Sequence, residues 1–250
     1  MADFIIIIRS EPDASCDVAM LKRYKVPAIA IPVMRAESLS FRLPDIVSFQ
    51  AVVFTSRHAV AAITDSPSIR SLRSLPTYAV GRSTASAARK AGFDNIIVGH
   101  GSGSGLVSMM TTDLCPHAGT LLWPSATIIG FDISASLAKF GFVVQQMPVY
   151  AMPARAHSST YLSDRLVTNS SAAVVAMSAR SIDLFSKMLK LEKLDDHRQI
   201  ITVIAGSQSI ASAAGSGWAN ILVAKAPRRT RLLTIATFMH RRRASLVRNS

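Results

Sequence analysis

The chain has 250 residues, of which 49% are hydrophobic, and this length fits one large domain or two domains of ordinary size. Two cysteines without close spacing argue against a disulfide framework and a zinc knuckle, and no apolar run approaches the roughly 20 residues that span a bilayer, so we expect a cytoplasmic protein. The net charge is +13, and seven arginines fall in residues 227–250. We interpret the segment HRRRASLVRN as a frayed, solvated C-terminus. The positive charge of the remaining chain favours an acidic ligand, and nucleic acid is disfavoured because only 6% of residues are aromatic.

Short apolar runs alternate with helical stretches along the whole chain. The runs predict strands at 4–8, 51–54, 78–80, 96–98, 120–123, 142–147, 173–177 and 200–205. The stretches between them predict helices at about 14–24, 57–64, 83–91, 105–114, 131–140, 158–168, 180–190, 208–215 and 229–240. The runs are continuous, which is typical of parallel strands covered by helices on both faces. The alternation therefore predicts an α/β protein with doubly wound parallel sheets.

The chain repeats its own pattern in matched pairs of segments. Segment 4–13 aligns with 120–130, 21–34 with 137–150, 52–63 with 174–185, and 78–93 with 203–218. The offsets of the last three pairs are 116, 122 and 125, which is nearly constant. Such a duplication predicts two small sheets rather than one wide sheet. We expect the domain boundaries to follow Pro32-Val33 and Pro148-Val149, because proline suits the end of a strand.

Hydroxyl-rich turns follow most of the predicted strands, and each is expected to open a helix. These turns are Arg9-Ser10, Thr55-Ser56-Arg57, Gly81-Arg82-Ser83-Thr84, Pro124-Ser125, Ser178-Ala179-Arg180 and Gly206-Ser207-Gln208-Ser209. Ligands of open parallel sheets bind beyond the carboxyl ends of the strands, and the free N–H groups of a helix N-terminus favour an anion. An ordinary N-cap explains any one of these turns by itself. Several turns facing one cleft between two domains would suit an extended ligand with several carboxylates.

Other motifs point to no cofactor and no metal. The GSGSG segment at 101–105 lacks the third glycine of a dinucleotide loop and the Lys-Ser/Thr of a phosphate loop, so we interpret it as a flexible connection before a helix. The six histidines show no metal-binding spacing, and no Gly-x-Ser-x-Gly elbow occurs.

Five segments, taken in order, resemble the uroporphyrinogen-III synthase family, and the resemblance extends from residue 4 to about residue 236. They are VVFTSRHAV, YAVGRSTASAARKAGF, the MPVY segment, VVAMSARSIDLF and TVIAGSQSIASAAGSGW. The resemblance implies two flavodoxin-like α/β domains joined by a two-stranded connector. Residues 1–34 with 152–250 would form one domain, residues 36–148 would form the inserted domain, and the substrate would bind in the cleft between them. It also implies an enzyme that needs no cofactor, and we expect this enzyme to be a monomer.

The same resemblance implies a reaction and a set of site residues. The reaction is closure of the linear tetrapyrrole hydroxymethylbilane, which carries eight carboxylates, to uroporphyrinogen III, with loss of water and inversion of the last ring through a spiro intermediate. Tyr150 matches the tyrosine of the family and would assist departure of the hydroxyl group. The residues that would line the cleft are Thr55, Ser56, Gly81, Thr84, Ser178, Gly206, Ser207 and Ser209. Arg9, Arg57 and Arg180 are the expected partners of substrate carboxylates.

Two hypotheses stay open beside an enzyme of this family. One is a non-enzymatic two-domain protein that binds an acidic metabolite with the same turns. A Rossmann-type dehydrogenase or transferase comes third, because the glycine fingerprint is missing. The segment PSATIIGFD, which follows the strand at 120–123, also departs from the arginine-containing turn that many family members carry there.

Overall fold

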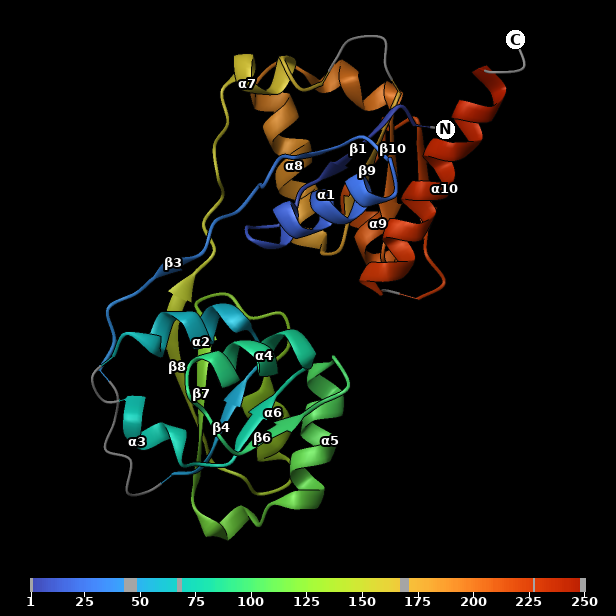
Figure 1. Ribbon diagram of the computed structural model, residues 1–250. Coiled ribbons are helices and arrows are strands. Elements are labelled where there is room, and N and C mark those ends of the chain that lie inside the picture. The colour runs from blue at the N-terminus through green and yellow to red at the C-terminus, as the bar shows by residue number, and fades with distance from the viewer. Residues whose placement is uncertain (1, 43–48, 67–68, 167–170, 227, 248–250) are drawn as a thin grey trace. The chain divides into compact units, whose positions relative to one another are not determined.

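The computed structural model describes residues 2–42, 49–66, 69–166, 171–226 and 228–247 (Figure 1). The chain divides into two compact units. Unit 1 comprises Met1–Arg35 and Pro153–Ser250, and unit 2 comprises Ala36–Met152.

Unit 1 is a five-stranded, all-parallel sheet with helices on both faces (Figure 1). Its strands are β1 (Phe4–Ile7), β2 (Ala28–Ala30), β9 (Ala172–Ala176), β10 (Ile201–Ala205) and β11 (Asn220–Val223), in the spatial order β11-β10-β9-β1-β2. One face packs against α1 (Asp13–Arg23) and α10 (Arg229–Val247), and the other against α7 (Ser159–Ser163), α8 (Ala179–Leu191) and α9 (Gln208–Ala214). The 3₁₀ helix η3 (Asp195–Ile200) leads into β10.

Both faces of the unit 1 sheet are buried, and this explains the continuous apolar strands. Ile5 and Ile7 pack with the core formed by α1 and α10, whereas Ile6 packs with the core formed by α7, α8 and α9. Successive side chains of a strand point to opposite faces, so a strand covered on both sides must be apolar at every position.

Unit 2 is a six-stranded sheet in which only β3 runs antiparallel to its neighbour (Figure 1). Its strands are β3 (Glu37–Ser38), β4 (Phe49–Phe54), β5 (Thr77–Ala79), β6 (Ile96–Val98), β7 (Thr120–Ala126) and β8 (Val144–Ala151), in the order β3-β8-β7-β4-β5-β6. One face packs against α2 (Arg57–Thr64), α3 (Ile69–Arg73) and α4 (Arg82–Lys90), and the other against α5 (Gly103–Asp113) and α6 (Ile133–Ala138). The 3₁₀ helix η2 (Pro116–Ala118) precedes β7.

The two sheets have the same order of strands when the strands are matched by the repeat in the sequence. The repeat pairs β2 with β8, β1 with β7, β9 with β4, and β10 with β5. Unit 1 places these strands in the order β2-β1-β9-β10, and unit 2 places their counterparts in the order β8-β7-β4-β5. In chain order, unit 1 follows the flavodoxin pattern, whereas unit 2 is a circular permutation that begins at the third strand of that pattern. The prediction of two doubly wound parallel sheets is confirmed.

The two segments by which the chain passes between the units are paired with each other. The amide N–H of Leu39 donates to the Val149 carbonyl (2.9 Å), that of Arg35 to Pro153 (3.2 Å) and that of Arg155 to Val33 (2.9 Å). Together with the antiparallel pairing of β3 and β8, these bonds form the expected two-stranded connector.

Several predicted boundaries were wrong. The strand predicted at 142–147 is β8, which runs through Pro148 to Ala151. Pro148 is tolerated because the β7–β8 register shifts between Ser125 and Ala126, next to its pairing position. Within HRRRASLVRN, residues 240–247 are helical and not frayed as predicted, because α10 continues to Val247, and its earlier turns are anchored by buried Leu232 and Ala236; the last two residues of this segment lie outside the described residues. Part of the helix predicted at 158–168 lies outside the described residues.

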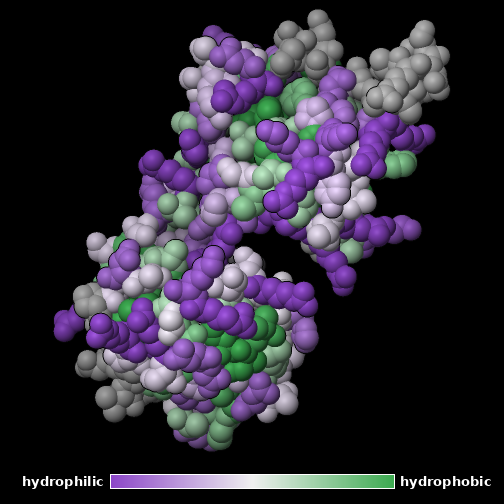
Figure 2. Space-filling view, viewed as in Figure 1, coloured by the Kyte–Doolittle hydropathy of each residue, from purple (hydrophilic) through white to green (hydrophobic). Residues whose placement is uncertain are grey.

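Hydrophilic residues cover most of the visible surface of each unit, and green hydrophobic residues gather on part of the visible face of unit 2 (Figure 2). Within the described ranges, no helix has the length and the apolar content that crossing a membrane requires.

Candidate functional site

The carboxyl ends of β4 and β5 lead directly into helices of unit 2. Ser56 is the N-cap of α2, and its Oγ accepts a hydrogen bond from the His58 amide (3.1 Å). Gly81 is the N-cap of α4 in an extended conformation. A Cβ on Gly81 would lie 3.5 Å from Gly101 Cα, an ordinary contact, so this position does not require glycine. Thr84 lies inside α4 and is 5% exposed, so its hydroxyl does not cap the helix.

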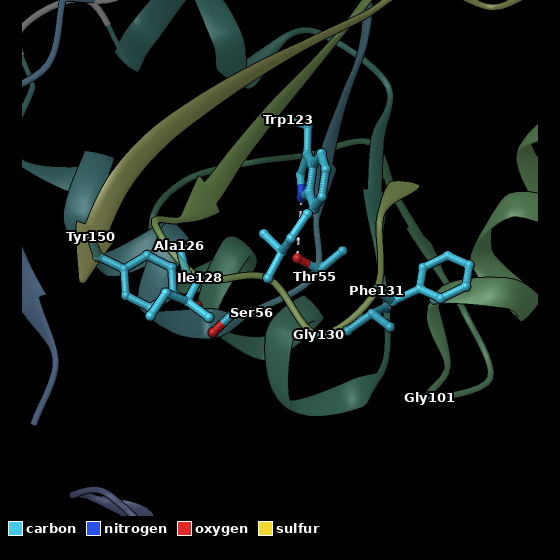
Figure 3. Close-up of a pocket in the computed structure, with 12 residues that line it drawn as sticks. Thr55, Ser56, Gly101, Trp123, Ala126, Ile128, Gly130, Phe131 and Tyr150 are labelled. Atoms are coloured by element: carbon cyan, nitrogen blue, oxygen red, sulfur yellow. Dashed lines mark hydrogen bonds between the residues drawn. The ribbon is translucent and has the colours of Figure 1, made fainter. Parts of the chain in front are cut away.

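A pocket of about 360 Å³ opens at this edge of the sheet, and we call it the unit 2 pocket (Figure 3). This volume lies within the roughly 300–1,000 Å³ of small-molecule sites. The pocket is lined by Thr55, Ser56, Val80, Gly101, Gly103, Trp123, Ala126, Ile128, Ile129, Gly130, Phe131 and Tyr150. Three of the sequence-predicted residues, Thr55, Ser56 and Tyr150, therefore meet in one cavity, and Gly81 and Thr84 are not among its lining residues.

Tyr150 is a buried phenol at one end of this pocket. Its side chain is 7% exposed, and its ring centroid lies 5.9 Å from that of His58. Burial raises the pKa of Tyr150 above 10.0, and a hydrogen bond with the Ser56 side chain opposes this rise. Tyr150 is therefore a neutral phenol near pH 7 and retains a proton to donate.

Thr55 is oriented by a tryptophan from the neighbouring strand. The indole Nε1 of Trp123 donates a hydrogen bond to Thr55 Oγ1 over 3.2 Å, which Figure 3 draws as a dashed line. An indole N–H only donates, so the hydroxyl of Thr55 acts as the acceptor and its own proton is left for another partner. Because Thr55 lines the pocket, its hydroxyl can donate to a ligand there.

In unit 1 the corresponding strands lead into two capped helices. Ser178 caps α8 by accepting from the Ser181 amide (3.1 Å), and Ser207 caps α9 by accepting from the Ile210 amide (3.4 Å). Ser209 lies 2.9 Å from Ser207 between hydroxyl oxygens. Gly206 is buried, and Arg180 is half-buried in the first turn of α8. Because β9 and β10 are neighbours, these two helix N-termini share one edge of the sheet.

Arg9 is engaged with carboxylates of the protein itself. Its guanidinium lies 2.6 Å from Asp13 and 3.2 Å from Asp17, both on α1. Asp17 is fully buried and also pairs with Arg229 of α10. A substrate carboxylate would have to compete with these partners for Arg9. Arg57, the third arginine that the sequence singles out, is half-buried at the start of α2.

Two turns predicted to open helices do not do so. Ser125 lies inside β7 and is 1% exposed, where its hydroxyl accepts from Gln146 Nε2 (3.0 Å). Pairing of β7 with β4 ends at Leu122, so the strand passes Pro124 without interrupting that ladder. Ser10 lies three residues before α1 and contributes only its carbonyl, which accepts from the Asp13 amide (3.1 Å).

Other lining residues were missed from the sequence. The GSGSG segment is more than a flexible connection: Ser102 caps α5 by accepting from the Gly105 amide (3.1 Å), and Gly101 and Gly103 line the pocket. Phe131, in the loop after β7, also lines the pocket. The only signal in the sequence was that the segment PSATIIGFD, which contains Phe131, departs from the family pattern.

The described part of the chain contains no candidate metal site. Within those residues, no group of three or more His, Cys, Asp or Glu side chains is placed so that it could hold a metal ion.

The chain is similar to known proteins over most of its length. The family model described as uroporphyrinogen-III synthase HemD matches residues 18–234. The crystal structure of uroporphyrinogen-III synthetase from Helicobacter pylori 26695 is similar with a TM-score of 0.68 at 17% identity, covering 94% of this chain and 99% of that one. A mutant uroporphyrinogen III synthase from the bacterium Thermus thermophilus is similar with a TM-score of 0.55 at 15% identity, covering 97% and 99%. These structural likenesses show a common fold. No curated protein sequence matches this chain significantly.

Proposed function

The chain belongs to the uroporphyrinogen-III synthase family, a family of hydro-lyases, and on that premise we propose that it closes hydroxymethylbilane to uroporphyrinogen III with loss of water. We propose a monomeric, cytoplasmic enzyme that acts without a cofactor. The substrate carries four linked pyrroles and eight carboxylates, so it needs both flat apolar contacts and donors for anions.

One observation carries the proposal: a buried, neutral tyrosine lies in a pocket at the carboxyl edge of a parallel sheet, with two hydroxyl side chains beside it. Tyr150, Thr55 and Ser56 line the same cavity (Figure 3). Ligands of such sheets bind at this edge, and a pocket with a few convergent polar groups and a perturbed pKa is the expected form of an active site.

Tyr150 acts first, as the acid that assists departure of the hydroxyl group. Its phenol gives its proton to the hydroxymethyl oxygen while the carbon–oxygen bond breaks, so that water leaves. The adjoining pyrrole nitrogen supplies the electron pair and becomes cationic. Because burial raises the pKa of Tyr150, the phenol holds this proton throughout the neutral range.

Ring closure follows by carbon–carbon bond formation. The substituted α-carbon of the last ring attacks the terminal methylene and forms a spiro intermediate. The older bond to that carbon then breaks and re-forms at the unsubstituted α-carbon, which inverts the ring. The proton released from that carbon returns to the Tyr150 phenolate, so the sum of the steps is loss of one water. Holding the bilane in the conformation for this attack is the main task of the site.

Substrate carboxylates are proposed to bind at helix N-termini in each unit. In unit 2 the donors would be the first amides of α2 and α4 beside Ser56 and Gly81, with Arg57 as the nearby cation and Thr84 in a supporting position. In unit 1 they would come from the turns at Ser178 and Arg180 and at Gly206, Ser207 and Ser209. Arg9 could contribute only by exchanging its bonds to Asp13 and Asp17.

Separation of the porphyrin isomers tests the proposal. Hydroxymethylbilane is generated in situ, the purified protein is added, and the products are oxidised and separated. Without an enzyme the bilane closes to isomer I, whose last ring is not inverted. We expect isomer III to dominate when the protein is present. Isomer I alone, at the level of a protein-free blank, would defeat the enzyme proposal, and tight binding of the tetrapyrrole in that case would favour a non-enzymatic binder.

A further inference from the structure

The unit 2 pocket has a second, apolar end that the proposed mechanism does not use. Figure 3 shows Tyr150 and Ser56 toward one end of the pocket and Phe131 toward the other, with Thr55 and Trp123 between them. Phe131 and Ile128 belong to the loop after β7, and their side chains are 41% and 63% exposed. We call these two side chains the loop wall.

The loop wall is unusual because its two large apolar side chains are exposed and also line a cavity. Large apolar side chains that face a pocket with few polar groups generally mark the surface that a ligand covers. Trp123, which is 1% exposed, forms a rigid floor beside the wall. In Figure 3 Ile128 lies beside Tyr150, whereas Phe131 lies at the other end of the pocket, so the wall extends from the polar groups at Tyr150 to the apolar end.

Phe131 is seated directly on a glycine of α5. A Cβ placed on Gly103 would lie 2.4 Å from Phe131 Cδ1 and 2.9 Å from Cγ, closer than real contacts allow. The backbone of Gly103 is not in the left-handed region, so a side chain there would be opposed by the ring and not by its own torsions. The Phe131 ring can therefore lie in this position only because residue 103 has no side chain.

We propose that the loop wall, Ile128 and Phe131, is a specificity-determining surface that packs against the face of a pyrrole ring of the substrate, and that Gly103 positions Phe131 for this contact. This inference rests on the proposed function. A pocket of about 360 Å³ is too small for four linked pyrroles with eight carboxylate arms, so it takes one end of the chain. Tyr150 then meets the hydroxymethyl end while the wall covers the ring that carries or adjoins it.

A double-mutant cycle tests the contact. Phe131→Ala should raise the KM for hydroxymethylbilane about tenfold with kcat within about twofold, because the aromatic face is lost while Tyr150 is untouched. Gly103→Ala should raise KM similarly by displacing the ring. The double variant should be no worse than Phe131→Ala alone, because both changes act on one contact. Phe140→Ala is the matched control: Phe140 is 55% exposed in the same unit and does not line the pocket, so its variant should match the parent.

A binding measurement separates this inference from the proposed function. In a Trp218→Phe background Trp123 is the only tryptophan left, and uroporphyrinogen III added anaerobically should quench its fluorescence. Weaker quenching by Phe131→Ala but not by Phe140→Ala supports the wall. Equal affinity and KM for Phe131→Ala and an active, binding parent would overturn the wall and leave the enzyme proposal standing. A parent that neither binds the tetrapyrrole nor forms isomer III would overturn both.

Discussion

Trp123 lies in β7, Thr55 directly follows the neighbouring strand β4, and the two are joined by a hydrogen bond of 3.2 Å from the indole Nε1 to the threonine Oγ1. The indole is buried, and the threonine lines the unit 2 pocket. A buried tryptophan therefore orients a hydroxyl at the proposed site. This contact makes Trp123 a positioning residue, with consequences for binding that differ from those of ordinary core packing.

Substituting Trp123 by phenylalanine should weaken substrate binding. The variant keeps an aromatic ring but loses the donor, so the Thr55 hydroxyl can rotate away from the ligand. We expect KM to rise about fivefold and the free energy of unfolding to fall by about 1–3 kcal/mol. Trp218→Phe is the matched control, because its indole also donates a hydrogen bond, to the Ala214 carbonyl over 2.9 Å, but lies in unit 1 outside this pocket. Equal increases in KM for both variants would refute the positioning role.

Replacing Tyr150 by phenylalanine should lower kcat by about 100-fold and leave KM nearly unchanged. The ring remains to pack in the pocket, and only the proposed acid is lost; general acids contribute about 10²–10⁴-fold. Steady-state kinetics with hydroxymethylbilane give both constants. Tyr24→Phe is the control, because Tyr24 is 56% exposed and lies at the C-terminal end of α1 in unit 1. A Tyr150→Phe variant as active as the parent would remove the acid role while leaving the family assignment intact.

The pH profile of kcat should show no alkaline loss from Tyr150 below pH 10. Burial raises the pKa of this phenol above 10.0, and the acid form is the active one, so activity is lost only as the pH passes that raised value. Rate measurements between pH 6 and about 9.5 check this expectation. An alkaline limb inside that range that disappears in Tyr150→Phe would contradict it.

Alkaline pH should lower the free energy of unfolding less in a Tyr78→Phe variant than in the parent. Tyr78 donates a hydrogen bond to Asp113 (3.3 Å), and burial together with the negative charge of Asp113 raises the pKa of Tyr78 to about 12. The unfolded chain releases this proton near pH 10, so ionisation favours unfolding as the pH rises from about 10 to about 12. The free energy of unfolding, measured by urea denaturation across this range, should fall more steeply for the parent than for the variant. Identical slopes would show that Tyr78 does not carry the effect.

The buried carboxylate of Asp17 should be important for the stability of unit 1. It is fully buried and pairs with Arg9 and Arg229, which ties α1 to α10. Asp17→Asn leaves both arginines without a charged partner at that position, and we expect a loss of about 2–3 kcal/mol. Asp183→Asn is the control, because its pair with Lys187 is exposed and should contribute less than about 0.5 kcal/mol. Chemical denaturation compares the two; similar losses would contradict this assignment.

Much of the fold could be predicted because burial on both faces of a sheet leaves a continuous apolar run in the sequence. This holds for β1, β9 and β10, whose residues are almost all buried. The strands β2, β3 and β11 were not predicted as separate strands. The two residues of β3 are polar, and β2 and β11 have only three and four residues, none of them buried. The permuted order of unit 2 was implicit in the repeat, because each matched segment occupies the matching place in its sheet.

Local rules also explain which part of the site could be predicted. The caps at Ser56, Ser178 and Ser207 depend on a few consecutive residues, and the sequence contains that signal. The contact of Gly103 with Phe131 joins residues from α5 and from the loop after β7. Only the folded sheet brings those two segments together, and a glycine followed by polar residues indicates a flexible connection until its neighbour is known.

The position of a bound tetrapyrrole tests the account most directly. A crystal structure of the full chain with uroporphyrinogen III, grown without oxygen, would show which residues touch the product. We predict that part of the macrocycle occupies the unit 2 pocket, with the Tyr150 hydroxyl near a methylene bridge and Thr55 donating to a polar substituent. A product bound with Tyr150, Thr55 and Ser56 all outside contact distance would contradict the claim that this pocket is where the ring closes.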